Sequence, residues 1–165
     1  MLRSTLFACT VFMAVSGCSS AQATVRVEPA NPQSPRPLPE QTQTAAIRDY
    51  LQSWQSLRAA LEQNRSDLLD PAFVGTARDK LAEAIQQQAA LGIRTRYQDS
   101  AHDIQIVFYS PEGLSIELTD RVEYDVQVLD HDRVNTIQHI SARYVIVLTP
   151  AEVRWRVRVF QAALK

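Results

Sequence analysis

Three side chains in the second half of the chain have types that could together move protons: His102, Asp120 and Tyr144. A carboxylate can hold an imidazole in one orientation, and an imidazole held in this way can accept or donate a proton near neutral pH. A phenol beside them can donate a hydrogen bond to an oxygen on which negative charge develops. The three residue types therefore permit general acid–base chemistry if the fold brings them together.

The segments that carry these residues alternate apolar and polar side chains. The alternating apolar residues fall within 104–108, 114–128, 140–148 and 153–159, and Asp120 is the polar interruption of the second segment. Alternation with a period of two is typical of antiparallel strands that have one face in water. The sequence therefore predicts antiparallel strands joined by hairpins.

The direction of the side chains predicts which residues share a row. Paired residues on antiparallel strands point to the same face, and a slip of one residue reverses that face. An odd-length loop at 131–133 puts Asp120 opposite Tyr144, and an odd-length loop around Pro111 puts His102 opposite Asp120. One row facing the helices would then be His102–Asp120–Tyr144.

Two alternatives to this row stay open. A two-residue turn at Pro111-Glu112 would place Asp103 opposite Asp120 and separate the three residues. Alternatively, His102 lies at a strand end in water and Asp120 marks a bulge or bend. We favour this structural interpretation, because polar interruptions in strands are often bulges.

Helices are predicted before the strands. Residues 44–63 repeat apolar side chains every three or four positions, which predicts a long helix with one apolar face. Residues 66–71 indicate a turn or short helix that ends at its proline. Thr76 and Asp79 are spaced like a capping box for a second helix, and Gly92 suits its C-terminal cap. Helices followed by strands predict an α+β fold, with the helices on one face of a curved antiparallel sheet.

The sequence gives little support for metal, cofactor or nucleic-acid binding. Asp130-His131-Asp132 has metal-ligand types, but aspartate is also a favoured turn residue, so we expect a turn and no metal. The chain has no phosphate-binding glycine loop, no Gly-x-Ser-x-Gly and no His-Glu-x-x-His, and we expect no cofactor. Without Arg3 the chain keeps 16 of its 17 basic residues against 18 acidic ones, so no nucleic-acid partner is expected.

The N-terminus has the three parts of an export signal. Residues 1–3 include Arg3, residues 6–15 are apolar except for Thr10, and small residues precede Cys18. The motif Val15-Ser16-Gly17-Cys18 resembles a bacterial lipobox. This resemblance implies that residues 1–17 are a lipoprotein signal peptide and that Cys18 is acylated, with palmitate or a similar chain. The alternative is an ordinary signal peptide cut nearby.

The lipobox resemblance also implies a location. The protein would be lipid-anchored in the cell envelope, and Ser19 after the cysteine resembles the pattern sorted to the outer membrane, facing the periplasm in a diderm cell. Residues 18–43 are rich in proline and poor in large apolar side chains, so we expect a disordered tether. Residues 44–165 are expected to form one domain. Because Cys9 leaves with the signal, this domain has no free thiol.

The domain also resembles a known family. The residues that carry the resemblance are Tyr50-Leu51-x-x-Trp54, Arg143-Tyr144 and Trp155-Arg156-Val157. Together with the order of helices and strands, they resemble the nuclear-transport-factor-2-like cone. Within that fold they are most similar to the intermembrane-space (IMS) domain of the chloroplast division protein and its cyanobacterial relatives. The resemblance implies protein binding and not catalysis.

We therefore expect a membrane-tethered envelope lipoprotein with a non-catalytic domain that binds a protein or a small ligand. The alternative is a small cone-fold enzyme, of the isomerase or dehydratase kind, that uses His102, Asp120 and Tyr144. The residues expected to line a pocket or contact a partner are Trp54, Asp120, Tyr124, Tyr144 and Trp155. The expected membrane contact is the lipid on Cys18, and the sequence does not indicate an oligomeric state.

Overall fold

A computed structural model describes residues 22–29, 34 and 36–163 of the 165-residue chain. In chain order its elements are β1 (Thr24–Val27), α1 (Glu40–Gln63), a 3₁₀ turn (Ser66–Leu69), α2 (Gly75–Ala90), β2 (Ile93–Tyr109), β3 (Ile116–Asp130), β4 (Arg133–Ala151) and β5 (Arg154–Ala162). The strands form one sheet in the order β1-β2-β3-β4-β5, and only β1 runs parallel to its neighbour. The α+β class predicted from the sequence is confirmed.

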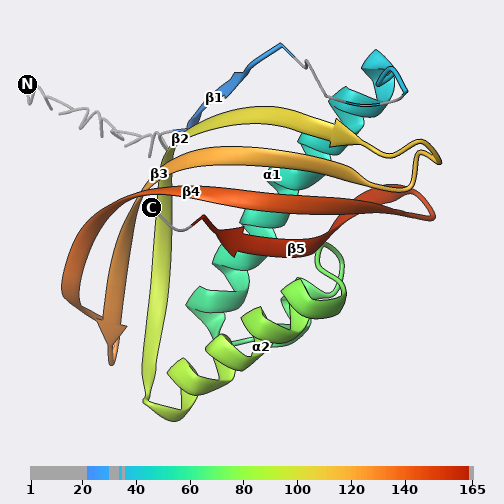
Figure 1. Cartoon of the computed structure of the whole chain (residues 1–165). Helices are drawn as coiled ribbons and strands as arrows, with labels where there is room; N and C mark the ends of the chain where they lie inside the picture. Colours follow the sequence, from blue (N-terminus) through green and yellow to red (C-terminus); the bar gives the residue numbers. More distant parts are fainter. Residues whose placement is uncertain (1–21, 30–33, 35, 164–165) are drawn as a thin grey trace, which may run out of the picture.

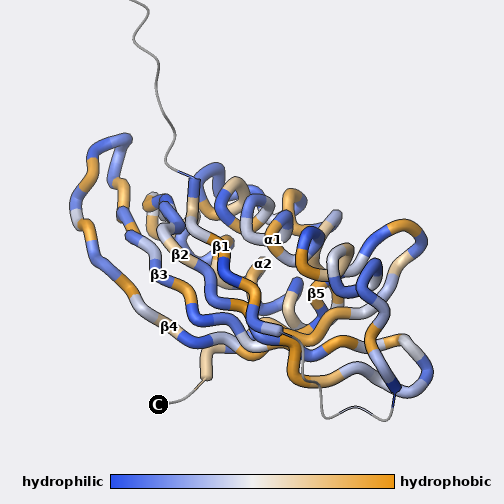
Figure 2. The backbone as a smooth tube through the Cα atoms, turned by 90° about the horizontal axis from the view of Figure 1, so that it is seen from above, coloured by the Kyte–Doolittle hydropathy of each residue, from blue (hydrophilic) through white to orange (hydrophobic). Residues whose placement is uncertain are grey.

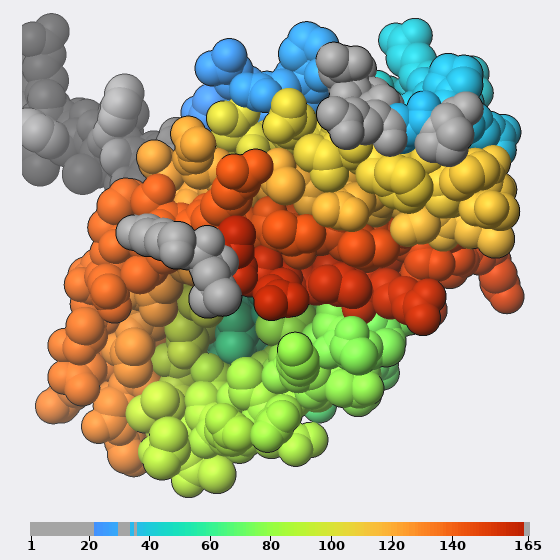
Figure 3. Space-filling model, viewed as in Figure 1, coloured from blue at the N-terminus to red at the C-terminus, as the bar shows by residue number. Residues whose placement is uncertain are grey.

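The sheet curves around the two helices. Both helices lie on the concave face, and the long arm formed by β2, β3 and β4 bends toward the end of α2 (Figure 1, Figure 2). The apolar sides of the helices and the inward side chains of the sheet form one core that includes Leu57, Ile85, Leu118 and Ile146. The opposite face of the sheet forms a broad outer surface (Figure 3). None of the helices in the described part of the chain is long and apolar enough to cross a membrane.

Both helices begin earlier than the sequence predicts. Helix α1 begins at Glu40 and not at residue 44, and α2 begins at Gly75 after Val74. The predicted capping box is wrong, because no side chain caps α2 and the Thr76 hydroxyl instead donates to the carbonyl oxygen of Arg158, 3.2 Å away in β5. The C-terminal prediction is confirmed, since Gly92 has a φ of 70° and its N–H donates to the Ala89 carbonyl at 3.0 Å.

The prediction of a fully disordered tether is wrong for residues 24–27. They form β1, which pairs with residues 101–104 of β2. The next contacts continue along the same edge, because the Glu28 N–H donates to the Ile104 carbonyl and the Tyr109 N–H donates to Ser34 Oγ. An edge strand offers unpaired backbone groups, and these groups hold the segment in place despite its low apolar content.

The expected length of the β3–β4 loop is wrong, but the expected face is right. Asp130 pairs with Arg133, so the turn consists of His131 and Asp132, whose φ angles are 46° and 65°. A two-residue turn alone would reverse the faces. The register shifts by one residue at Asn135, and this bulge restores them. Asp120 therefore lies opposite Tyr144, as predicted.

A similar correction applies between β2 and β3. Tyr109 pairs with Ile116, which leaves residues 110–115 as the connection, so neither the odd-length loop nor the Pro111-Glu112 turn occurs. A bulge between Ile106 and Phe108 restores the predicted face. The residue opposite Asp120 is Ile104, and His102 lies opposite Val122. The predicted pairing of His102 with Asp120 across the strands is therefore wrong. The register is displaced by two residues, which keeps both side chains on the predicted face.

Candidate functional site

His102 and Asp120 meet on the concave face of the sheet despite the shifted register. They lie diagonally on β2 and β3, and His102 Nδ1 is 2.7 Å from Asp120 Oδ2. Their side chains are 3% and 0% exposed, and Asp120 pairs on both sides without a register shift. The favoured interpretation, with His102 at a strand end in water and Asp120 at a bulge or bend, is therefore wrong. A carboxylate only accepts hydrogen bonds, so Nδ1 carries the proton that it donates to Asp120. This bond fixes the orientation of the ring and leaves Nε2 as the second functional atom.

Asp120 has a second buried partner that the sequence did not indicate. Tyr50 of α1 donates its phenol hydrogen to Asp120 Oδ2 at 2.8 Å, and the Trp54 indole N–H donates to Tyr50 Oη at 2.8 Å. A continuous chain of hydrogen bonds thus links Trp54, Tyr50, Asp120 and His102. The signal was present in the four-residue spacing of Tyr50 and Trp54, but both residues also fit an apolar helix face.

The ionisation of Tyr50 is suppressed in this environment. Burial raises the pKa of its phenol well above the usual 10.0, and the negative charge of Asp120 raises it further. Tyr50 therefore stays protonated and acts as a hydrogen-bond donor to the carboxylate. The other oxygen of Asp120, Oδ1, is buried and has no hydrogen-bond partner within the described residues.

Tyr144 does not join the His102–Asp120 pair in the predicted way. It lies opposite Asp120 in the sheet, but its phenol oxygen is 2.8 Å from that of Tyr124. The residue that donates its phenol hydrogen to Asp120 is Tyr50. The three residues of the predicted row thus share one face. The tyrosine that is hydrogen-bonded to the carboxylate, however, belongs to α1 and not to β4.

Aromatic side chains fill the inside of the curved sheet. The Trp54 ring centroid lies 5.3 Å from His102, 5.9 Å from Tyr124, 5.7 Å from Tyr144 and 5.4 Å from Phe160. Distances of this kind, with rings tilted or edge-to-face, are favourable for aromatic packing. Three of the predicted pocket residues, Trp54, Tyr124 and Tyr144, therefore form part of the packed interior.

Trp155 lies apart from this cluster and links β5 to α1. Its side chain is partly buried against the core, and its backbone N–H donates to Asp49 Oδ2 at 2.8 Å. Two residues further on, Val157 exchanges backbone hydrogen bonds with the segment before α2, at 2.9 Å with Val74 and 2.8 Å with Ala72. The motif Trp155-Arg156-Val157 therefore holds the helices to the edge of the sheet.

A cleft of about 400 Å³ lies beside the buried pair, between β1, α1 and β2. His102 and Trp54 lie at its base, and the polar side chains Gln55, Arg58 and Asp99 also line it. No hydrogen-bond partner of His102 Nε2 is found within the described residues, and this atom is not among the buried unpaired ones. Within the buried hydrogen-bond chain, His102 Nε2 is therefore the atom that can contact a ligand in the cleft.

Arg58 and Asp99 form an ion pair in the cleft, and the arginine is much more exposed than the aspartate. Arg58 Nη1 lies 3.4 Å from Asp99 Oδ2, and the two side chains are 43% and 6% exposed. Burial raises the pKa of the Asp99 carboxyl above the usual 3.8, and the nearby charges of Arg58 and His102 oppose this rise. Asp99 Oδ1 is buried without a partner in the part of the chain that the structure describes, so this carboxyl has one hydrogen-bond acceptor unused.

The other histidines lie at exposed positions. His131 is in the β3–β4 turn beside Asp130, and His139 pairs with Asp125 at 2.9 Å on the outer face. Across residues 22–29, 34 and 36–163, no group of three or more metal-ligating side chains is found. In the Asp130-His131-Asp132 segment, Asp130 ends β3 and the other two residues form the predicted turn. Cys18 lies outside the described residues, so its lipidation stays a prediction.

No family model matches the sequence, and no curated protein matches it. Solved structures do match. The intermembrane-space region of the chloroplast protein ARC6 aligns with a TM-score of 0.65 and 12% identity over 79% of this chain and 100% of that one. A candidate scytalone dehydratase from Novosphingobium aromaticivorans aligns with a TM-score of 0.51 and 12% identity, over 75% and 88% of the two chains.

A structure from Catenulispora acidiphila also aligns with a TM-score of 0.51 and 12% identity, over 75% of this chain and 94% of that one. At this level of identity, similarity shows the fold alone. The fold is the nuclear-transport-factor-2-like cone that the sequence resemblance implied.

Proposed function

We propose that this chain is a membrane-tethered lipoprotein of the cell envelope whose cone domain binds a ligand, without catalysis, in the cleft beside His102. The ligand is a small polar molecule or a polar side chain presented by a partner protein. The lipid anchor on Cys18 and the outer-membrane location that Ser19 suggests belong to the same proposal.

The observation that carries the binding function is the packing of the interior. Trp54, Tyr124, Tyr144 and Phe160 fill the space that an enclosed substrate pocket would need, and Asp120 is 0% exposed. The cleft, in contrast, is open and offers polar groups of both kinds, with Arg58 as a donor and Asp99 as an acceptor. An open cleft with a few placed polar groups favours recognition.

Photo-crosslinking in intact cells tests the binding function. A photoreactive amino acid at Gln55, an exposed residue of the cleft, is expected to give a defined adduct whose mass distinguishes a protein from a small molecule. The matched control is the same substitution at Gln86, an exposed glutamine on α2. The Arg58→Ala variant should weaken the adduct at Gln55. Equal adducts at Gln55 and Gln86 would contradict the proposal.

Metabolic labelling with a fatty acid tests the anchor separately. The wild-type chain should incorporate the label and the Cys18→Ala variant should not. An unlabelled wild-type chain, or a label that survives in the variant, would refute the lipid anchor and leave the cleft hypothesis unaffected.

A second candidate function is supported by the geometry of the His102–Asp120 pair. A histidine whose Nδ1 is fixed by a carboxylate 2.7 Å away, and whose Nε2 meets a cleft, has the arrangement of a general base. Such a base would serve an isomerase or dehydratase reaction. Turnover of a cleft ligand that disappears in His102→Gln, while ligand binding persists, would establish the enzyme. Binding lost in His102→Gln without turnover in the wild type supports the binding domain.

A further inference from the structure

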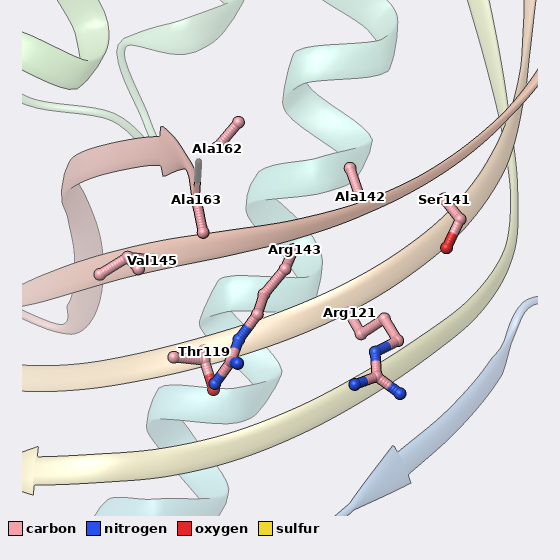
Figure 4. Close-up of a pocket in the computed structure, with 8 residues that line it drawn as sticks. All are labelled: Thr119, Arg121, Ser141, Ala142, Arg143, Val145, Ala162 and Ala163. Carbon is pink, nitrogen blue, oxygen red and sulfur yellow. The ribbon is translucent and has the colours of Figure 1, made fainter. Parts of the chain in front are cut away.

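The outer face of the sheet carries a second polar site. Two adjoining hollows, of about 490 and 250 Å³, lie there and share the residues Thr119, Arg121 and Arg143. Figure 4 shows the side chain of Arg143 reaching from β4 to Thr119 of β3, with Arg121 further along β3. Because successive side chains of a strand point to opposite faces, Arg121 faces away from the buried Asp120. This site is therefore separated from the His102 cleft by the thickness of the sheet.

The positions of Arg121 and Arg143 do not favour the stability of the sheet. Arg121 and Arg143 lie directly opposite each other on β3 and β4. Like charges at opposed positions destabilise a sheet. Neither guanidinium makes an ion pair or a side-chain hydrogen bond within the described residues, whereas Arg94, also on a strand, pairs with Asp132. Both guanidinium groups are thus available to an anion in the hollows.

The smaller hollow is also lined by two carboxylates, which come from β2 and from the residue after β1. Asp103 lies opposite Arg121 across β2 and β3, and Glu28 follows β1. No ion pair joins Asp103 to Arg121 in the described part of the chain, and Asp103 Oδ1 is buried without a hydrogen-bond partner. A buried carboxylate oxygen without a partner is costly unless a donor satisfies it. The hollow is therefore lined by the two arginines and by the carboxylate residues Asp103 and Glu28.

We propose that this hollow binds a small zwitterion, in which an oxyanion lies between Arg121 and Arg143 and an ammonium group reaches Asp103 and Glu28. Guanidinium groups bind carboxylate and phosphate oxygens through paired hydrogen bonds, and an ammonium group donates to carboxylates. A volume of about 250 Å³ suits a molecule of the size of a free amino acid or of phosphoethanolamine. The shared chemistry of these ligands is an oxyanion close to a primary ammonium group.

Calorimetric titration of the full-length chain in detergent tests this proposal with four probes. Phosphoethanolamine carries both charges, inorganic phosphate carries the oxyanion alone and ethanolamine carries the ammonium alone. Phosphoethanolamine should bind at least about tenfold more tightly than either partial probe, which corresponds to about 1.4 kcal/mol. Glycine, as the fourth probe, shows whether the site prefers a carboxylate zwitterion to a phosphate one. If both zwitterions bind no more tightly than inorganic phosphate, the proposal is wrong.

Three variants assign the roles of the residues. Arg143→Ala should weaken both phosphate and phosphoethanolamine binding by about tenfold, and Arg143→Lys should recover only part of it, because an ammonium group lacks the planar fork. Asp103→Asn should reduce the affinity for phosphoethanolamine to that for phosphate. The control is Arg133→Ala, at an exposed arginine that begins β4 and lies ten residues before Arg143, which should change nothing. Equal losses in Arg133→Ala and Arg143→Ala would refute the site, and urea unfolding verifies that each variant folds.

Discussion

His102 and Asp120 form a hydrogen bond of 2.7 Å although they are not opposite each other in the sheet. Ile104 occupies the position opposite Asp120, and His102 reaches the carboxylate diagonally from the next same-face position of β2. Diagonal neighbours on one face are within reach of long and aromatic side chains. The geometry also leaves room for Tyr50, which approaches the same carboxylate oxygen from α1.

The Asp120→Asn variant should destabilise the fold measurably. The substitution keeps the shape but removes the charge that accepts hydrogen bonds from Tyr50 and His102, at a residue that is 0% exposed. We expect a loss of about 1–3 kcal/mol in the free energy of unfolding, measured by urea denaturation. Asp125→Asn is the matched control, because its pair with His139 is exposed and should contribute less than about 1 kcal/mol. Equal effects would contradict the buried network.

Removal of the Tyr50 hydroxyl should also destabilise the fold and alter the fluorescence of Trp54. In Tyr50→Phe, Asp120 loses a donor and the Trp54 indole N–H loses its acceptor. We expect a loss of about 1–3 kcal/mol, because the buried Trp54 indole N–H loses its acceptor and Asp120 keeps only the donor from His102. Tyr97→Phe is the comparison, since no hydrogen bond of that hydroxyl is found within the described residues, although burial raises its pKa to about 12. A stability loss in Tyr97→Phe as large as in Tyr50→Phe would argue against the hydrogen-bond explanation.

The stability should depend on pH through Asp99 with a defined sign. Burial raises the pKa of its carboxyl above 3.8, so the folded state binds this proton more tightly than the unfolded chain. The contribution of Asp99 to stability is therefore greatest in acid and decreases as the pH rises from about 3.8 through the folded-state pKa. Asp99→Asn should raise the free energy of unfolding at neutral pH and leave it unchanged in acid.

Asp67 should show the opposite pH dependence. A hydrogen bond from Arg65 lowers the pKa of this exposed carboxyl below 3.8. Its small contribution is therefore present above pH 3.8 and is lost as the pH falls through the folded-state pKa. Asp67→Asn should slightly lower the stability at neutral pH and leave it unchanged in strong acid. Urea unfolding across the acid range distinguishes the two carboxyls, and the same sign in both variants would invalidate the assignment.

The β3–β4 turn should accept a stabilising change. His131 and Asp132 both have positive φ angles, 46° and 65°, a conformation that costs most residues about 1 kcal/mol. Replacing the pair by Asn-Gly, the favoured sequence of such a turn, should raise the free energy of unfolding by about 1 kcal/mol. Glycine at Glu152 in the β4–β5 turn, which has no positive φ, should not stabilise the protein. A destabilised Asn-Gly variant would show that the Asp132–Arg94 ion pair matters more than the backbone.

The sequence by itself determined which side chains face the core. Alternation in β3 and β4 placed Asp120 and Tyr144 on one face, and the bulges at Asn135 and near Val107 kept that face although the predicted loop lengths were wrong. This was possible because the direction of a side chain in a strand is a local property that repeats every two residues. The order of helices and strands likewise sufficed to predict the α+β class.

Only the tertiary structure decided which of these residues meet. Tyr50 lies 70 residues before Asp120, and their hydrogen bond exists because α1 packs across the concave face of the sheet. The exact partner of His102 depended on the length of the 110–115 connection and on the bulge near Val107, and the order of residues 24–27 depended on an open strand edge. Contacts of this kind arise from packing between distant segments, and no local pattern in the sequence specifies them.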